Sequence, residues 1–299
     1  MVRRVVLFLA VNAAVVLTIS VVANLLGLGS YLAARGMRLD SLLVFCALFG
    51  IGGAFISLQL SRWTAKHALG VQLIDPGNPH NEIEAFLVER IRHLCARAGM
   101  QTLPEIGVYP SREVNAFATG PSKDRSLVAV STGLLERLDD TAVEGVLGHE
   151  IAHVANGDMV TMTLIQGVVN TFVMFLARVI AFAIDSFLSR DRESRGLGGF
   201  AYIMVVMVLE TVLMLLAAPV IYAFSRWREY RADAGAAELT SRRAMIHALE
   251  SLRENSKRVD REQPALAMLK IHGEPRGWIA KLYASHPPLT ERIRALERA

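Results

Sequence analysis

Charged residues are scarce in this sequence. Only 20% of the 299 residues are Asp, Glu, Lys or Arg, whereas soluble domains contain about 25%. Hydrophobic residues make up 53%, and the mean hydropathy is +0.36. The net charge of +4 comes without a run of basic residues, which excludes nucleic acid as a partner. This composition also excludes a disordered chain and an ordinary soluble enzyme, so we predict a protein that contacts lipid.

Cysteine is nearly absent as well. Cys46 and Cys95 are the two cysteines of the chain, and Cys46 lies in an apolar stretch. Two cysteines cannot build a disulfide framework. We therefore expect the soluble part of the protein to occupy a reducing compartment.

Long apolar runs are what the sequence has in abundance. A helix needs about 20 apolar residues to cross the hydrocarbon core of a bilayer. The first candidate exceeds the 7–15 apolar residues that are typical of a cleaved signal peptide, so we interpret it as a retained anchor. The sequence thus predicts four transmembrane helices, at about 5–28, 41–60, 159–184 and 199–224.

Basic residues beside these helices indicate their orientation, because Lys and Arg are enriched on the cytoplasmic side. One side would hold Arg3, Arg4, Arg62, Lys66, Arg226, Arg228 and Arg231, and the other Arg35, Arg38, Arg190, Arg192 and Arg195. The bias of seven to five predicts that both termini and the segments 61–158 and 225–299 are cytoplasmic.

Each of the two later apolar runs contains one charged residue, Arg178 or Glu210. A helix rises about 1.5 Å per residue, so in an antiparallel pair these two side chains would lie at heights where they could meet. An ion pair would offset part of the cost of charge in lipid. A proton or ion path is the alternative.

The segments 61–158 and 225–299 are expected to form one catalytic domain of α+β type. Apolar periodicity and turn residues predict its elements. They are a helix at 81–98, strands at 105–109, 114–119 and 126–131 with the last two paired, a helix from the capping box 141–144 to about 157, an amphipathic region at 225–258 and a helix at 290–298.

The sequence His149-Glu150-Ile151-Ala152-His153 lies inside the helix that is predicted to end near 157. Histidines at i and i+4 share one helix face and can bind one Zn²⁺ ion at about 2.0–2.1 Å. Zinc lowers the pKa of bound water towards about 7, and Glu150 could take the proton. The alternative is a pair of histidines on a solvated helix face.

A catalytic zinc needs a third protein ligand, and Glu229 is the best candidate. His153 lies six residues before the predicted helix 159–184, and Glu229 lies five residues after the predicted helix 199–224. In adjacent antiparallel helices the two positions would reach similar height. Asp233, one turn further, could accept a hydrogen bond from a ligand imidazole. Alternatively, Glu229 is an ordinary charged residue at the start of a helix.

Three motifs give the chain a family resemblance. They are G-H-E-I-A-H-V-A-N-G-D at 148–158, R-E-Y-R-A-D at 228–233 and S-H-P-P-L-T-E-R at 285–292, and V-N-A-F-A-T-G at 114–120 extends the similarity over nearly the whole chain. They resemble the Ste24/Oma1/HtpX family of membrane-bound zinc metalloproteases, in particular its bacterial HtpX branch. The longer set of helices of the Ste24 branch is missing, which argues against processing of prenylated peptides.

The resemblance implies a mainly helical α+β protein with four transmembrane helices and a cytoplasmic gluzincin-type domain. It implies a zinc endopeptidase of the bacterial inner membrane that degrades damaged or misfolded membrane proteins under stress. By the same match, one zinc ion per chain is bound by His149, His153 and Glu229, with Glu150 as the general base.

Two further site predictions concern the substrate. The strand at Asn115-Ala116-Phe117-Ala118 could bind an extended substrate by main-chain hydrogen bonds, or it could be an ordinary core hairpin. His286 could donate to the oxyanion of the tetrahedral intermediate, or it could serve packing or helix capping. Arg292 could brace the acidic ligand shell.

Two other functions use the same residues. A metal transporter could carry zinc through the His149, His153 and Glu229 cluster, but transport sites usually lie near the bilayer midplane and these histidines precede an apolar run. An inactive adaptor is disfavoured by the intact Glu150. The expected partners are protein substrates and the lipid bilayer, with oligomers possible.

Overall fold

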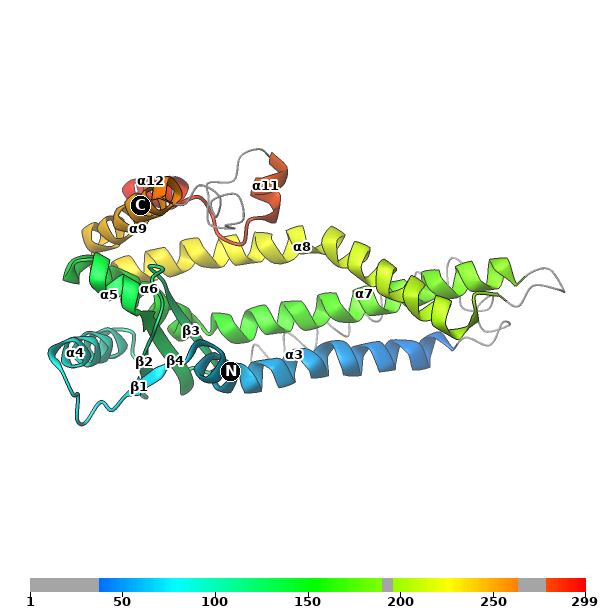
Figure 1. Cartoon of the computed structure of the whole chain (residues 1–299), viewed down its shortest axis with the longest axis horizontal. Coiled ribbons are helices and arrows are strands. Elements are labelled where there is room, and N and C mark those ends of the chain that lie inside the picture. The colour runs from blue at the N-terminus through cyan, green and yellow to red at the C-terminus, as the bar shows by residue number, and fades with distance from the viewer. Residues whose placement is uncertain (1–37, 190–195, 263–277) are drawn as a thin grey trace. The chain divides into compact units, whose positions relative to one another are not determined.

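A computed structural model describes residues 38–189, 196–262 and 278–299 of the chain (Figure 1). The predicted helix at 5–28 lies outside these ranges. In chain order, the described elements are α3 (Leu39–Leu69), β1 (Gln72–Ile74), α4 (Glu82–Arg97), β2 (Glu105–Tyr109), β3 (Ala116–Ser122), β4 (Arg125–Ser131), α5 (Thr132–Arg137), α6 (Asp140–Asn156), α7 (Asp158–Leu188), α8 (Gly198–Leu239), α9 (Arg242–Glu262), α11 (Trp278–Tyr283) and α12 (Leu289–Arg298).

The chain divides into two compact units. We call residues 1–57 and 161–221 the apolar unit, and residues 58–160 and 222–299 the mixed unit. Helices α3, α7 and α8 each begin in one unit and end in the other. The mixed unit holds the strands and all of the residues predicted for the catalytic site.

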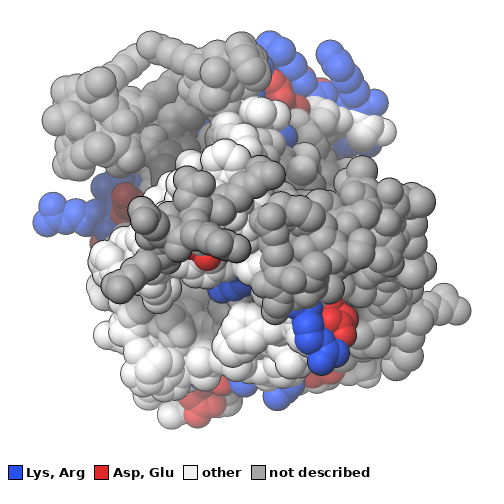
Figure 2. Space-filling model, turned by 90° about the vertical axis from the view of Figure 1, so that its right-hand side faces the viewer, with Lys and Arg blue, Asp and Glu red and all other residues white. Residues whose placement is uncertain are grey.

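The apolar unit contains long hydrophobic helices. Within the described ranges, α3, α7 and α8 are each long and apolar enough to cross a membrane, with window hydropathies of 2.2, 2.0 and 2.5. The predicted spans 41–60, 159–184 and 199–224 fall inside them. In the space-filling view of Figure 2, the described residues are mostly uncharged, with some Lys, Arg, Asp and Glu side chains among them. Large apolar side chains such as Leu48 and Phe200 are 68% and 79% exposed. Such a surface suits lipid.

Helix α8 differs from the expectation. The sequence predicted a membrane helix that stops at 224 and a separate amphipathic region at 225–258, but one helix runs from Gly198 to Leu239, and α9 follows from Arg242. The helix does not end at 224, because a change from apolar to polar residues does not interrupt backbone hydrogen bonds, and no Gly or Pro lies between 220 and 234. The break comes at Ser241, whose hydroxyl accepts from the Ala244 amide.

A charged pair lies inside the apolar unit. Arg178 Nη1 donates to Glu210 Oε1 at 2.6 Å and to the Met174 carbonyl at 3.0 Å. The guanidinium carbon also lies 5.7 Å from the centroid of the Phe45 ring. This confirms the predicted ion pair. A cavity of about 430 Å³ borders Glu210 and Asn170.

The sheet of the mixed unit has the strand order β1-β2-β4-β3. Strands β3 and β4 are antiparallel, which confirms the predicted hairpin, and β2 is parallel to β4. Sequence analysis missed β1, a three-residue strand that pairs antiparallel to β2. Within the described residues β3 has no strand on its outer side.

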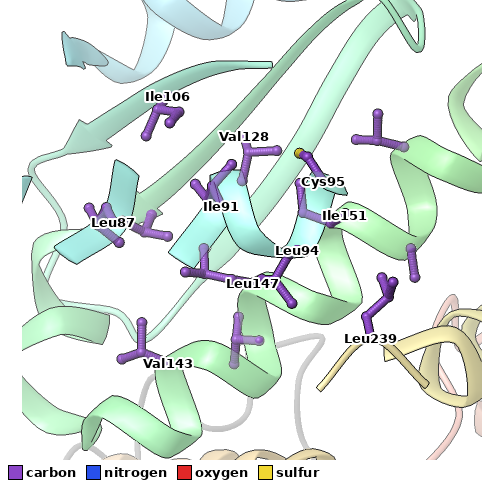
Figure 3. Close-up of a cluster of buried hydrophobic side chains, with 14 of the residues drawn as sticks. Leu87, Ile91, Leu94, Cys95, Ile106, Val128, Val143, Leu147, Ile151 and Leu239 are labelled. Atoms are coloured by element: carbon purple, nitrogen blue, oxygen red, sulfur yellow. The ribbon is translucent and has the colours of Figure 1, made fainter. Parts of the chain in front are cut away.

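The core of the mixed unit lies where α4 and α6 meet the sheet, as Figure 3 shows. Burial of one such aliphatic side chain stabilises the fold by about 1.5–3 kcal/mol. The largest fully buried side chains of this core are Leu87, Ile91 and Leu94 from α4, Leu147 and Ile151 from α6, Ile106 from β2 and Leu134 from α5.

Helix α6 has clear signals at both ends. The Asp139 carboxylate accepts from the Ala142 amide at 2.8 Å, so the predicted capping box that starts at Thr141 was wrong. Asp at the N-cap competes well with Thr and adds a favourable charge at the helix N-terminus. The helix ends, as predicted, where Gly157 adopts a left-handed conformation with φ 65°.

Gly145 permits close packing of α6 against α9. A Cβ atom at this position would lie 2.7 Å from Ala248 Cβ and 2.8 Å from the Ala244 carbonyl oxygen. We expect Gly145→Ala to lower the free energy of unfolding by about 1–2 kcal/mol through overpacking. The melting temperature of the purified chain in detergent should fall by a few degrees. Gly77→Ala is the matched control, because its Cβ would meet only Asp75 Oδ1 at 3.4 Å. Equal melting temperatures would contradict this packing.

The Arg178–Glu210 pair yields a second prediction. Arg178→Leu leaves Glu210 without its partner, which should cost about 3–5 kcal/mol of stability. The double variant Arg178→Leu/Glu210→Leu removes both charges and should recover most of that loss. Unfolding titrations in mixed micelles measure both effects. A double variant that is no more stable than Arg178→Leu would argue against a structural pair.

Candidate metal centre

Helix α6 directs His149 and His153 to one point. The two residues are 8% and 6% exposed, and their Nε2 atoms lie 3.0 Å apart. This follows from their spacing, since residues at i and i+4 are stacked on one face of a helix. The structure therefore places both imidazoles as the H-E-x-x-H pattern predicts.

Glu229 of α8 joins this pair. Its Oε2 lies 3.4 Å from His149 Nε2, and its Oε1 lies 3.3 Å from His153 Nε2. One ligand atom from each of the three residues falls within a group no more than 4.8 Å across. Chain segments 76 residues apart thus converge, as the paired-helix argument expected.

The donor set fits a zinc ion. Glu229 is 1% exposed, and both of its carboxylate oxygens are buried without a hydrogen bond. Nearby histidine and arginine nitrogens offset part of the cost of burying this carboxylate, and a metal ion would satisfy its oxygens directly. Two imidazole nitrogens and one carboxylate oxygen are a common ligand set of catalytic Zn²⁺, which leaves a coordination position open.

The electrostatics of the centre also favour positive charge. Burial would raise the pKa of Glu229, but the close nitrogens of His149, His153 and His286 outweigh it and hold this pKa far below its ordinary value. Burial and the Arg292 charge oppose protonation of His149, yet Asp233 and Glu229 outweigh them and raise the pKa of His149 to about 9. A cation is therefore stabilised here, as a metal ion would be.

Asp233 and Arg292 lie behind His149, where they were predicted. His149 Nδ1 is 2.9 Å from Asp233 Oδ1, and Arg292 Nε donates to Asp233 Oδ2 at 2.8 Å. Burial would raise the pKa of Asp233, but the hydrogen bonds from Arg292 and His149 hold it below its ordinary value. With Nδ1 engaged in this way, Nε2 of His149 is free to bind a metal.

Sequence reasoning missed two residues that contact His153. Asp158 Oδ2 lies 2.7 Å from its Nδ1, and Arg228 Nη1 lies 3.0 Å from both of its ring nitrogens. Arg228 Nη2 is also 2.8 Å from Glu229 Oε1. Asp158 and Arg228 belong to two of the motifs quoted above, but a five-residue spacing across a helix end gives no signal of contact with His153.

Glu150 follows His149 on α6, and His286 contacts Glu229. Glu150 is half-buried. Burial would lower the pKa of Arg292, but the nearby carboxylates of Asp233, Glu229 and Glu150 outweigh this effect and raise that pKa. His286 is exposed, with Nδ1 2.9 Å from Glu229 Oε2. It also lines a cavity of about 290 Å³.

Strand β3 supplies the predicted edge. Ala116, Phe117 and Ala118 pair with β4, and the Asn115 carbonyl accepts from the Ser131 amide at 2.9 Å. Helix α6 contacts β3. The edge therefore lies beside the helix that carries both histidines.

Comparison with known proteins identifies the family. The sequence profile of peptidase family M48 matches residues 82–299. The chain belongs to peptidase family M48. A Protease HtpX homolog of Bacillus licheniformis is 48% identical over 301 residues and each chain is covered to 99%, while Protease HtpX of Cellvibrio japonicus is 50% identical over 98% of this chain and 97% of its own.

The fold is shared with a solved structure. The crystal structure of S. mikatae Ste24p matches with a TM-score of 0.59 at 20% identity, over 95% of this chain and 66% of that one. The match to family M48 and the full-length similarity to HtpX proteins confirm the predicted family relationship. This M48 protein is a multi-pass membrane metalloprotease that acts on protein substrates.

In this M48 protease, Arg292 forms ion pairs with the buried carboxylates of Asp233 and Glu229. We expect Arg292→Ala to lower the free energy of unfolding by about 3–5 kcal/mol, because Asp233 loses its charged partner inside the protein. Arg294→Ala on the exposed side of α12 is the control and should change stability by less than about 0.5 kcal/mol. Chemical unfolding followed by tryptophan fluorescence measures both. Similar values for the two variants would show that Arg292 has no such role.

Proposed function

We propose that this M48 metalloprotease is a zinc endopeptidase of the bacterial inner membrane that hydrolyses damaged or misfolded membrane proteins during stress. The buried cluster of His149, His153 and Glu229 carries the proposal. The full-length similarity to proteins named Protease HtpX supports it. Those relatives are proteases, which favours this function over the metal transporter considered above.

The proposed reaction assigns a role to each residue. His149, His153 and Glu229 would hold a zinc ion, which would supply the Lewis acidity needed to activate water near neutral pH. Glu150 accepts a proton from the attacking water and passes it to the leaving amide nitrogen. His286 donates from its exposed imidazole to the oxyanion of the substrate.

Substrate binding would use the β3 edge. An extended peptide that pairs with Asn115-Ala116-Phe117-Ala118 would form main-chain hydrogen bonds that demand little of its sequence. The contact between β3 and α6 supports this route, since a peptide on the edge would pass beside the histidines. Such broad recognition suits substrates that are unfolded but have no sequence in common.

The proposed topology follows from the apolar segments. Four transmembrane helices, at about 5–28 and within α3, α7 and α8, place both termini and a gluzincin-type catalytic domain in the cytoplasm. The three apolar helices and the seven-to-five bias of basic residues support this orientation.

The test separates metal binding from catalysis. Glu150→Gln should retain about one zinc per chain but cleave an unfolded membrane substrate about 10²–10⁴-fold more slowly, since it lacks the proton acceptor. Glu229→Ala should lose both zinc and activity. Metal analysis and a gel-based cleavage assay measure the two properties.

Asp140→Asn, an exposed change on the same helix as Glu150, is the control and should keep both zinc and activity. Undiminished cleavage by Glu150→Gln would refute its role as general base. Full zinc content in Glu229→Ala would refute the ligand set.

A further inference from the structure

Gly157 and Asp158 turn the chain back towards His153. Gly157 ends α6 in the left-handed region at φ 65°, and Asp158 is the first residue of α7. This turn brings the Asp158 carboxylate to 2.7 Å from His153 Nδ1, and its side chain is 2% exposed. The N-terminus of α7 favours a negative charge at this position.

Arg231 holds the other oxygen of the same carboxylate. Its Nη2 donates to Asp158 Oδ1, across 73 residues of sequence. The guanidinium carbon of Arg231 lies 4.9 Å from the centroid of the Trp227 ring, one turn earlier on α8. Because Arg231 follows Glu229 by two residues, the pair joins the start of α7 to the part of α8 that carries the third candidate ligand.

The same order of groups stands behind the other histidine. Arg292, Asp233 and His149 form an arginine–carboxylate–imidazole chain, and Arg231, Asp158 and His153 form a second one. The carboxylate comes from α8 in the first chain and from α7 in the second, and the arginine comes from α12 in the first and from α8 in the second. Each histidine therefore has its own carboxylate and its own arginine behind it. This repetition indicates that both candidate ligands need such a carboxylate.

That requirement concerns the tautomer of His153. A neutral imidazole has one N–H and one lone pair. Arg228 Nη1, which lies 3.0 Å from both ring nitrogens, can only donate and would be satisfied by a lone pair on either. A carboxylate at Nδ1 accepts a hydrogen bond, so it fixes the proton on Nδ1 and leaves the lone pair on Nε2.

We propose that Asp158, held by Arg231, is a positioning residue that fixes the orientation and tautomer of His153 and thereby sets the affinity of the centre for its metal ion. The proposal rests on the proposed zinc site. Loss of a partner of this kind typically weakens metal binding about 10–100-fold.

The test compares zinc affinity in the full-length chain in detergent. Asp158→Asn should raise the zinc Kd about 10–100-fold, measured by competition with a chromogenic chelator. Arg231→Gln should raise it less, because the carboxylate remains. The double variant should bind no more weakly than Asp158→Asn, since both changes remove one device. Asp124→Asn, an exposed change in the β3–β4 turn, is the matched control and should bind like the wild type.

Cobalt substitution separates positioning from general stability. The visible absorption bands of the Co²⁺ protein report ligand geometry, and we expect them to shift in Asp158→Asn but not in Asp124→Asn. A lower melting temperature with unchanged Kd and unchanged bands would overturn the proposal. If Asp158→Asn does not fold, Arg231→Gln decides: weaker zinc binding supports the proposal, and wild-type affinity overturns it. A wild-type protein without zinc would instead refute the proposed function.

Discussion

The mixed unit is organised around one carboxylate that stays charged in its interior. Glu229 is 1% exposed, and a buried charge costs several kcal/mol unless other groups compensate it. Nitrogen atoms of three histidines and two arginines lie 2.8–3.4 Å from its oxygens. They come from α6, α8, α12 and the segment before α12, so one charge draws together elements that are far apart in sequence.

Further charged side chains surround the residues that compensate the Glu229 charge. Behind each ligand histidine is an acidic side chain, and behind each acidic side chain is an arginine. Alternating charges of this kind restrict the rotation of the imidazoles before any metal binds, which lowers the entropy lost on binding. The apolar unit follows the same rule, since the half-buried Arg178 is paired with Glu210. In both units, charge is tolerated because it is paired.

Local signals account for what the sequence predicted well. His149 and His153 follow from helical periodicity, and the hairpin of β3 and β4 follows from alternation around a turn. Asp158 was missed because Gly157 redirects the chain, and helical spacing cannot describe a contact across that turn. The end of α8 was misplaced because polarity changes at Ser225 while backbone hydrogen bonding continues. Tertiary contacts, such as that of Arg228 with His153, leave no periodic trace.

In the part of the chain that the structure describes, no strand pairs with the outer side of β3, which bears on how substrates would be chosen. Backbone pairing needs a stretch of polypeptide whose own amide and carbonyl groups are unengaged. In natively folded proteins those groups are hydrogen-bonded within helices and sheets, whereas an unfolded protein exposes them. The protease would then select substrates by whether their backbone is unfolded and free to pair, not by a recognition sequence. Folded proteins in the same bilayer would not be cleaved, because their backbone groups are already paired.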